Sequence, residues 1–301
     1  MSDPGGSVPR RDQIEAPQSG RFLSRRQLDL EMVRRGLAQS RSQAQELIDT
    51  GKIRVSGSVA NKAARLVAAG DPIVLVGDPP RFVSRGGEKL AAALEVFSID
   101  VGGRRVLDAG ASTGGFTDCV LQAGAAWVAA VDVGHGQLHE RIRGHDQVLV
   151  LERTNVRSLA PEDIEGQVSL VVGDLSFISL KTVLPALVDC LEPEGELVVL
   201  VKPQFEAGRH EVSKGRGVVR DPNVWTRVLI EVSDAALACG LGIMGVMVSP
   251  LHGADGNTEF LLYAASRSTT PLRMNASVHD RAAMIEAAVA LGERHLLGST
   301  T

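Results

Sequence analysis

The stretch from residue 105 to residue 118 constrains the fold of this chain most strongly. It joins a short apolar run, which ends in the acid Asp108, to a turn of small residues and then to a segment typical of a helix start. The turn contains Gly110, Gly114 and Gly115, which let the backbone bend sharply and approach a ligand closely. This pattern predicts the first strand, turn and helix of a doubly wound α/β sheet, where ligands bind at the carboxyl ends of strands. A purely structural turn would show the same pattern.

The spacing of the glycines limits which nucleotide such a turn could hold. A dinucleotide-binding turn has the pattern G-x-G-x-x-G, and a P-loop ends in Gly-Lys-Ser or Gly-Lys-Thr; neither occurs in residues 110–115. A dehydrogenase and a P-loop nucleotidase are therefore both disfavoured.

A second acid, Asp132, ends the next apolar run, 128–133. An acid in this place can accept hydrogen bonds from both hydroxyls of a ribose. S-adenosylmethionine, which has a positive sulfonium and no phosphate, fits an acidic site better than NAD does. Asn155 follows a strand predicted at 148–152, where it could contact the cofactor or cap a helix. The candidate cofactor-binding residues are Asp108, Gly110, Ser112, Thr113, Gly114, Gly115, Phe116, Asp132, Asn155 and Asp174.

Residues 21–77 predict a small, separate α+β domain with a basic surface. Two helical patterns, at 27–36 and 40–51, precede short strand-like runs at 53–55 and 73–76. The first fifty residues of this domain contain ten Lys or Arg and four Asp or Glu, whereas the whole chain has a net charge of −4. Such an excess favours phosphate binding over an ordinary solvated surface. The candidate RNA-binding residues are Arg25, Arg26, Arg34, Arg35, Arg41, Lys52, Arg54 and Lys62.

Strand-like and helix-like runs alternate after this basic domain, which predicts a parallel sheet with helices on both faces. Two late strands, one of them ending near Tyr263, predict a hairpin at the sheet edge. The glycine-rich basic segment 207–221 is predicted to be a mobile loop. The expected divisions of the chain are a disordered tail at 1–20, the basic domain at 21–77, a linker at 78–85, the sheet domain at 86–266 and a tail with a helix at 267–301.

Three charged residues lie at the ends of apolar strands, at the edge that faces the ligand crevice: Asp174, Lys202 and Glu259. A lysine at the end of a buried strand costs free energy unless it is paired or functional. Burial disfavours its charged form, so Lys202 is a candidate general base. Any one of the three could be a strand-end charge that reaches solvent. Lys89, in the first turn of a predicted helix, would on its own indicate a surface lysine.

Six motifs together resemble the TlyA family of ribosomal RNA 2′-O-methyltransferases, long labelled haemolysin A. They are residues 108–118, 132–138, 152–155, 174–180, 201–206 and 256–260. The resemblance implies a Rossmann-like class I methyltransferase sheet similar to FtsJ, with S-adenosylmethionine as cofactor. It also implies a catalytic tetrad of Lys89, Asp174, Lys202 and Glu259, and cytidines of one or both ribosomal subunits as targets. The helix pair and hairpin of the basic domain resemble the αL-type RNA-binding domain, which implies structured RNA as a partner.

Two other functions are compatible with parts of the sequence. A non-catalytic RNA-binding or ribosome-assembly factor would share the basic domain but would not need the tetrad. A haemolysin, as in the old family name, is disfavoured because no apolar run approaches the ~18–20 residues of a membrane helix. Three widely separated cysteines, with no metal-type spacing, indicate a reducing cytoplasm and no metal site. The sequence makes no prediction of oligomeric state.

Overall fold

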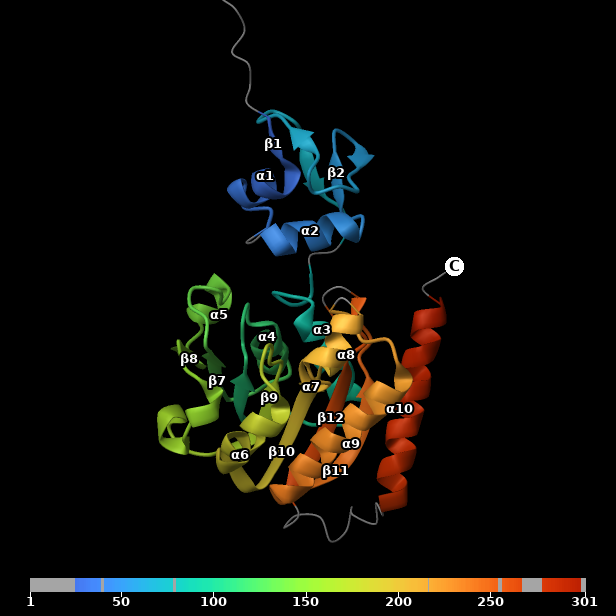
Figure 1. Cartoon of the computed structure of the whole chain (residues 1–301). Coiled ribbons are helices and arrows are strands. Elements are labelled where there is room, and N and C mark those ends of the chain that lie inside the picture. Colours follow the sequence, from blue (N-terminus) through green and yellow to red (C-terminus); the bar gives the residue numbers. More distant parts are fainter. Residues whose placement is uncertain are drawn as a thin grey trace, which may run out of the picture. The chain divides into compact units, whose positions relative to one another are not determined.

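The structure, a computed structural model, describes residues 25–38, 41–77, 80–215, 217–253, 256–266 and 278–298. The chain divides into two compact units after residue 78, and each unit is described by itself (Figure 1). The tail predicted at 1–20 lies outside the described residues, as does the segment 267–277 of the predicted C-terminal tail.

The first unit is a small α+β domain, and in its described residues eleven buried apolar side chains form the core, among them Leu28, Met32 and Ile53. The helices α1 and α2 and the strands β2 and β5 lie where the sequence predicts them, whereas the two-residue strand β3 was not predicted. Strands β1 and β4 form an extra two-stranded sheet, which was not predicted because two-residue strands leave no alternating pattern. The elements are β1 Arg26–Gln27, α1 Leu28–Arg34, α2 Arg41–Asp49, β2 Ile53–Val55, β3 Ser58–Val59, β4 Leu66–Val67 and β5 Ile73–Leu75.

The second unit contains a seven-stranded sheet in the order β11-β12-β10-β9-β6-β7-β8 (Figure 1). Strands β8, β7, β6, β9 and β10 are parallel, whereas β12 runs antiparallel to both β10 and β11. The predicted hairpin is therefore present, with β11 at the edge and β12 inserted beside β10. The strands are β6 Arg105–Ala109, β7 Trp127–Asp132, β8 Val148–Glu152, β9 Val168–Gly173, β10 Leu191–Val201, β11 Leu241–Val248 and β12 Phe260–Ser266.

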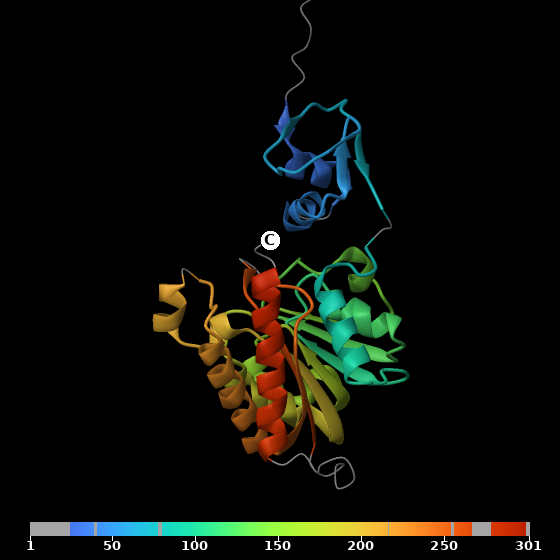
Figure 2. The same cartoon turned by 90° about the vertical axis from the view of Figure 1, so that its right-hand side faces the viewer.

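Helices cover both faces of this sheet, which confirms the predicted doubly wound α/β fold (Figure 2). The helices are α3 Gly86–Val96, α4 Gly115–Gln122, α5 Glu140–Arg143, α6 Leu180–Asp189, α7 Pro203–Glu206, α8 Arg209–Lys214, α9 Pro222–Ala238 and α10 Val278–Gly298. Two short 3₁₀ helices, Val156–Ser158 and Pro161–Ile164, join β8 to β9.

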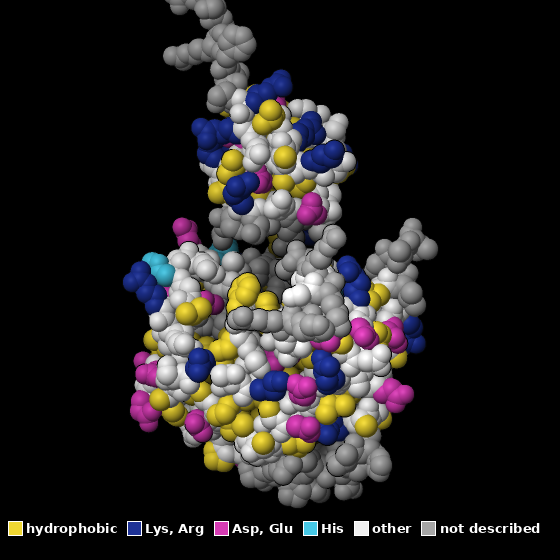
Figure 3. All heavy atoms as spheres, in the orientation of Figure 1, with side chains coloured by type: hydrophobic (Ala, Val, Ile, Leu, Met, Phe, Trp, Pro, Cys, Tyr) yellow, Lys and Arg dark blue, Asp and Glu magenta, His cyan; other side chains and the backbone are white. Residues whose placement is uncertain are grey.

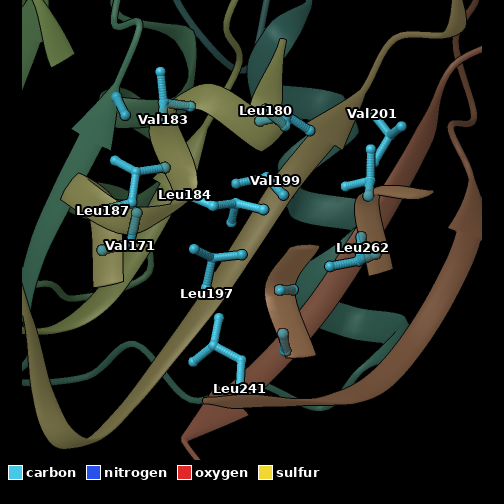
Figure 4. Close-up of a cluster of buried hydrophobic side chains, with 14 of the residues drawn as sticks. Val171, Leu180, Val183, Leu184, Leu187, Leu197, Val199, Val201, Leu241 and Leu262 are labelled. Carbon is cyan, nitrogen blue, oxygen red and sulfur yellow. The ribbon is translucent and has the colours of Figure 1, made fainter. Parts of the chain in front are cut away.

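Strand β10 shows why a nearly all-apolar run is needed in the centre of the sheet. Leu197 and Val199 pack on one face, against the layer that contains α6 and α9 (Figure 4). Val198 and Leu200 pack on the other face, against the layer of α3 and α4. Because alternate side chains point to opposite faces and both faces are covered, residues 197–201 of this strand are all buried.

The boundary segments of the second unit differ from the expected tail and linker. Phe82 and Val83, assigned to the linker, are buried in the core clusters of this unit, and the Val83 N–H donates to Asp118 Oδ2 over 2.8 Å. Helix α10, assigned to the C-terminal tail, buries Ile285 and Val289 against the sheet. The Pro/Gly-rich composition around residue 79 predicted a linker, and the polar composition after residue 266 predicted a tail. The apolar side chains next to these polar stretches are nevertheless buried.

The segment 207–221 was expected to be a loop, but it contains the short helix α8. Its end is held by Asn257, whose Oδ1 accepts from the Val219 N–H over 3.0 Å. The Trp225 indole N–H donates to the Val219 carbonyl over 2.9 Å. The first contact attaches residue 219 to the segment that precedes β12, and the second attaches residue 219 to the first turn of α9.

Candidate active site

The turn after β6 requires glycine at two positions. Gly110 has φ +87° and Gly114 has φ +92°, values that other residues adopt only with strain. A Cβ at Gly110 would lie 2.8 Å from the carbonyl oxygen of Asp174, at the end of β9. A Cβ at Gly115 would lie 2.2 Å from Ser84 Oγ. The turn is therefore packed tightly between the end of β9 and the segment that leads into α3.

Asp108 is fully buried at the end of β6, next to this turn. The Thr117 hydroxyl donates to its Oδ2 over 2.6 Å, but Oδ1 is buried without a hydrogen-bond partner in the described part of the chain. The pKa of Asp108 is raised to about 7, mainly by burial and also by the nearby charge of Asp174, against the lowering effect of the hydrogen bond from Thr117. A carboxylate oxygen left unpaired at a strand end fits a ligand with a positive charge or a hydrogen-bond donor.

Asp132, at the end of β7, forms one wall of a pocket. Its Oδ2 accepts from the Ser112 N–H over 2.8 Å, and its Oδ1 accepts from the Gly134 N–H over 2.6 Å. Each oxygen has a second lone pair, so the carboxylate can still accept from two hydroxyls. The pocket is also lined by Gln137 and Glu152. The hydrogen bond from Arg143 lowers the pKa of Glu152, so the pocket has two acidic walls.

The other candidate cofactor residues occupy different environments. Asn155 is exposed, and its Oδ1 accepts from the Arg157 N–H over 3.0 Å, which caps the 3₁₀ helix at 156–158. This contact matches the capping role that the sequence left open. Phe116 is buried in the core cluster that contains side chains of α3 and of the sheet. The Thr113 carbonyl accepts from the His139 N–H over 3.2 Å.

The four residues of the tetrad form two close ion pairs. Lys89 Nζ lies 2.5 Å from Glu259 Oε2, and both side chains are almost completely buried. Lys202 Nζ lies 2.6 Å from Asp174 Oδ1, and it also donates to Ser176 Oγ over 2.7 Å. Lys89 is therefore not the surface lysine that its local sequence alone would indicate.

Strand topology explains how these residues reach the same edge of the sheet. Asp174 and Lys202 directly follow β9 and β10, which are parallel neighbours, so both lie at carboxyl ends. Glu259 directly precedes β12, which is antiparallel to β10, with Val201 opposite Phe260. The start of β12 therefore lies beside the end of β10. Lys89 joins them from the first turn of α3.

Three polar or aromatic residues near the tetrad were not predicted as site residues, although all lie within the motifs 174–180 and 201–206. Ser176 contacts Lys202, and Gln204 donates from Nε2 to Glu259 Oε1 over 3.3 Å. Phe177 is 90% exposed with φ +62°, and its ring lies 5.0 Å from that of Phe205. A large apolar side chain just after a strand-end acid is the signal that could have identified Phe177.

The basic residues of the first unit are not equivalent. Lys52 is half-buried, whereas six others are exposed: Arg25, Arg26, Arg34, Arg41, Arg54 and Lys62. Figure 3 shows Lys and Arg side chains at the surface of this unit. Arg35 is also half-buried, and it donates to Glu31 and to the backbone carbonyls of residues 68, 69 and 71. Its guanidinium therefore connects α1 to the loop after β4, and Arg35 does not share the exposure expected of an RNA-binding residue.

The sheet order, the acids that end β6 and β7, and the glycine turn together define a Rossmann-like methyltransferase. The model of the FtsJ-like methyltransferase family matches residues 82–266, and that of the S4 domain matches residues 26–73. Both matches lie where the sequence predicted these domains. Together with the 52% identity to a TlyA protein over most of the chain, they show that the chain belongs to the TlyA family of FtsJ-like methyltransferases, with an S4 domain before the catalytic unit.

Similar proteins cover most of the chain. The 16S/23S rRNA (cytidine-2′-O)-methyltransferase TlyA of Mycobacterium tuberculosis is 52% identical over 82% of this chain and 92% of that protein. Hemolysin A of Brachyspira hyodysenteriae is 39% identical over 76% of this chain and 95% of that protein. A solved structure from Streptococcus thermophilus has a TM-score of 0.72 at 37% identity, over 92% of this chain and 99% of that one. In the described part of this chain, no helix combines the length and apolar character that crossing a bilayer requires.

Proposed function

We propose that this chain methylates the 2′-hydroxyl of a cytidine ribose in ribosomal RNA, with S-adenosylmethionine as methyl donor. The single observation that carries the proposal is the arrangement of Lys202, Asp174 and Ser176 beside the glycine turn. The name of the 52% identical relative from Mycobacterium tuberculosis gives the same reaction. The nucleotide and the ribosomal subunit come to this chain from that likeness alone.

The residues around the turn fit the proposed cofactor. S-adenosylmethionine supplies, when bound, a methyl group on a positively charged sulfur. Asp108 has an unpaired buried carboxylate oxygen, which suits a neighbouring positive charge. Asp132 and the pocket beside it provide acceptors for the two ribose hydroxyls. Gly110 and Gly114 give the turn a backbone conformation that other residues adopt only with strain.

Lys202 is the residue proposed to take the proton of the ribose 2′-hydroxyl that accepts the methyl group. A ribose hydroxyl is a poor nucleophile until its proton is removed or strongly hydrogen-bonded. When Lys202 acts as the base, its unprotonated amine donates its two N–H groups to Asp174 and Ser176, and its nitrogen lone pair accepts the proton of the hydroxyl. Because the amine is already held in place, positioning contributes a large part of the rate. Lys89 and Glu259 form the second pair at the same edge and orient the site.

The N-terminal S4 unit is proposed to hold the RNA through phosphate contacts. Its exposed Arg and Lys side chains provide the charge for such contacts. In the catalytic unit, the exposed ring of Phe177 offers a surface on which a nucleobase can stack.

The decisive experiment measures transfer of tritium from methyl-labelled S-adenosylmethionine to purified 30S and 50S subunits. Incorporation should appear in dinucleotides that resist alkali, since a methylated 2′-oxygen cannot take part in cleavage of the RNA backbone. Lys202→Ala should abolish it while cofactor affinity stays within about twofold. Tight RNA binding without any incorporation would instead support the non-catalytic alternative. Loss of cofactor affinity in Lys202→Ala would make Lys202 a cofactor-binding or structural residue.

A further inference from the structure

Gln204 lies in α7, two residues after Lys202, and its side chain contacts Glu259. Its Nε2 donates to Glu259 Oε1 over 3.3 Å, while Oε2 of the same carboxylate contacts Lys89 Nζ. An ionised carboxylate only accepts hydrogen bonds, so this contact fixes which end of the Gln204 amide faces it. Both oxygens of Glu259 are therefore held, one by Lys89 and the other by Gln204.

The same orientation leaves the amide oxygen of Gln204 buried without a hydrogen-bond partner in the described part of the chain. A buried acceptor without a partner lowers the stability of a fold, and a leucine of similar size would avoid that penalty. The glutamine is therefore a poor choice for packing alone. Unlike leucine, glutamine at this position provides an N–H group that donates to Glu259.

Helix α7 is anchored at the end opposite Lys202. Glu206 accepts from the Ser179 hydroxyl over 2.6 Å and from the Leu180 N–H over 2.7 Å. These contacts attach α7 to the start of α6, at the end of the loop that begins with Asp174. Gln204 is thus presented from an element that is fixed on both sides and that links one ion pair to the other: Lys202 directly precedes α7, and Gln204 reaches Glu259.

We propose that Gln204 is a positioning residue for methyl transfer. It holds Glu259, and through Glu259 the ammonium of Lys89, in a fixed orientation relative to Lys202. The inference rests on the proposed function, because the tetrad is taken to serve ribose methylation. It predicts that removing the N–H of Gln204 slows the chemical step without weakening cofactor binding.

The first test compares the full-length wild type with Gln204→Leu in the tritium-transfer assay. The expected result is a kcat lowered by about 10-fold to 100-fold, the range for one positioned hydrogen bond to a charged group. Affinity for S-adenosylmethionine, measured by calorimetry, should stay within about twofold. The matched control is Gln147→Leu, because Gln147 is an exposed glutamine in the same unit whose Nε2 donates to the Ala126 carbonyl over 2.9 Å. The control should keep the wild-type kcat.

The second test uses Gln204→Glu, which keeps the shape of the side chain but replaces the N–H by a second carboxylate. Two adjacent carboxylates share a proton at low pH, and that proton restores a donor between residues 204 and 259. The ratio of variant kcat to wild-type kcat should therefore rise severalfold from about pH 8.5 to about pH 6, while the same ratio for Gln204→Leu stays flat. A residue with a merely structural role would not produce this difference.

Three outcomes overturn the inference, and they are distinguishable. Wild-type kcat in Gln204→Leu would show that the contact with Glu259 is dispensable. Equal, pH-independent losses in Gln204→Leu and Gln204→Glu, together with a lower unfolding temperature, would make Gln204 a structural residue. An inactive wild type on both ribosomal subunits would overturn the proposed function, and this inference with it.

Discussion

Lys89 and Glu259 are 170 positions apart in the chain, yet the Lys89 ammonium lies 2.5 Å from the Glu259 carboxylate, and both side chains are almost completely buried. An ion pair of this kind gains strong attraction and loses the hydration of both charges, so its net contribution to stability is small. Removal of one partner is a different case, because the other charge is then buried without compensation. The pair can therefore be tested for stability and for activity separately.

Lys89→Met should lower the free energy of unfolding by roughly 3–5 kcal/mol, since it leaves Glu259 buried and uncompensated. The double variant Lys89→Met with Glu259→Gln should recover most of that loss, because no buried charge remains and the Gln204 contact can persist. Both variants should methylate RNA at least ~100-fold more slowly than wild type. Urea unfolding followed by circular dichroism gives the stabilities. Wild-type activity in the double variant would show that the pair serves only the fold.

Asp108 should make the stability of the catalytic unit depend on pH near neutrality. Its folded pKa, about 7, is raised above the ordinary 3.8 by burial. A raised carboxyl pKa contributes stability that is fully present below about pH 3.8 and is lost as pH rises towards 7. Asp108→Asn lacks this titration, so its stability relative to wild type should increase over that window by roughly 4 kcal/mol and then level off. A pH-independent difference between the two proteins would contradict the assignment.

The same carboxyl group should couple cofactor binding to proton release. A cation beside Asp108 favours the ionised form of this carboxyl group. The affinity for S-adenosylmethionine should therefore increase as the pH rises from about 5 to about 7 and stay constant above that range. Calorimetry in two buffers of different ionisation enthalpy measures the protons released. Asp108→Asn should bind more weakly and release fewer protons. Equal proton release in both proteins would assign the titration to another group.

The parts of this fold that the sequence predicted are those determined by neighbouring residues. The apolar run of β10 and the glycine turn after β6 carry their signals within a few positions, and both were interpreted correctly. Lys89 could not be interpreted in that way, because its environment depends on Glu259 and on how β12 inserts beside β10. Only the family resemblance brought it into the predicted tetrad.

Arg34 and Arg35 of the S4 unit also show that an environment set by distant residues cannot be predicted from the local sequence. The two are adjacent and chemically identical, but Arg34 is exposed, whereas Arg35 donates to carbonyls more than thirty positions away. Helical spacing places side chains on faces, but it does not reveal which distant backbone oxygens will meet one of them. The predicted linker at 78–85 differs from the structure for a related reason, since burial of Phe82 depends on the sheet and not on its Pro-rich neighbours.

Glu31 should control the acid stability of the S4 unit. Hydrogen bonds from Arg34 and Arg35 lower its pKa from 4.5 to about 2. A lowered carboxyl pKa contributes stability that is present above pH 4.5 and is lost as pH falls towards 2. Glu31→Gln should therefore unfold more easily than wild type at neutral pH, with the difference shrinking over that acid window. The exposed Asp49, changed to Asn, is the control. A constant difference between Glu31→Gln and wild type would show that the arginines do not act on this carboxylate.

Arg54 and Arg35 should separate RNA binding from folding within one small domain. Arg54 is exposed on β2, so Arg54→Ala should weaken RNA binding at low salt and reduce the slope of log K against log salt by roughly 0.7–0.9, the value for one lost phosphate contact. Its unfolding temperature should match wild type. Arg35→Ala should instead lower the unfolding temperature, because carbonyls of residues 68, 69 and 71 lose their donor. Filter binding at several salt concentrations and differential scanning calorimetry measure the two effects. If Arg54→Ala leaves the salt slope unchanged, the exposed basic residues of this unit are a solvated surface and the RNA contacts lie elsewhere.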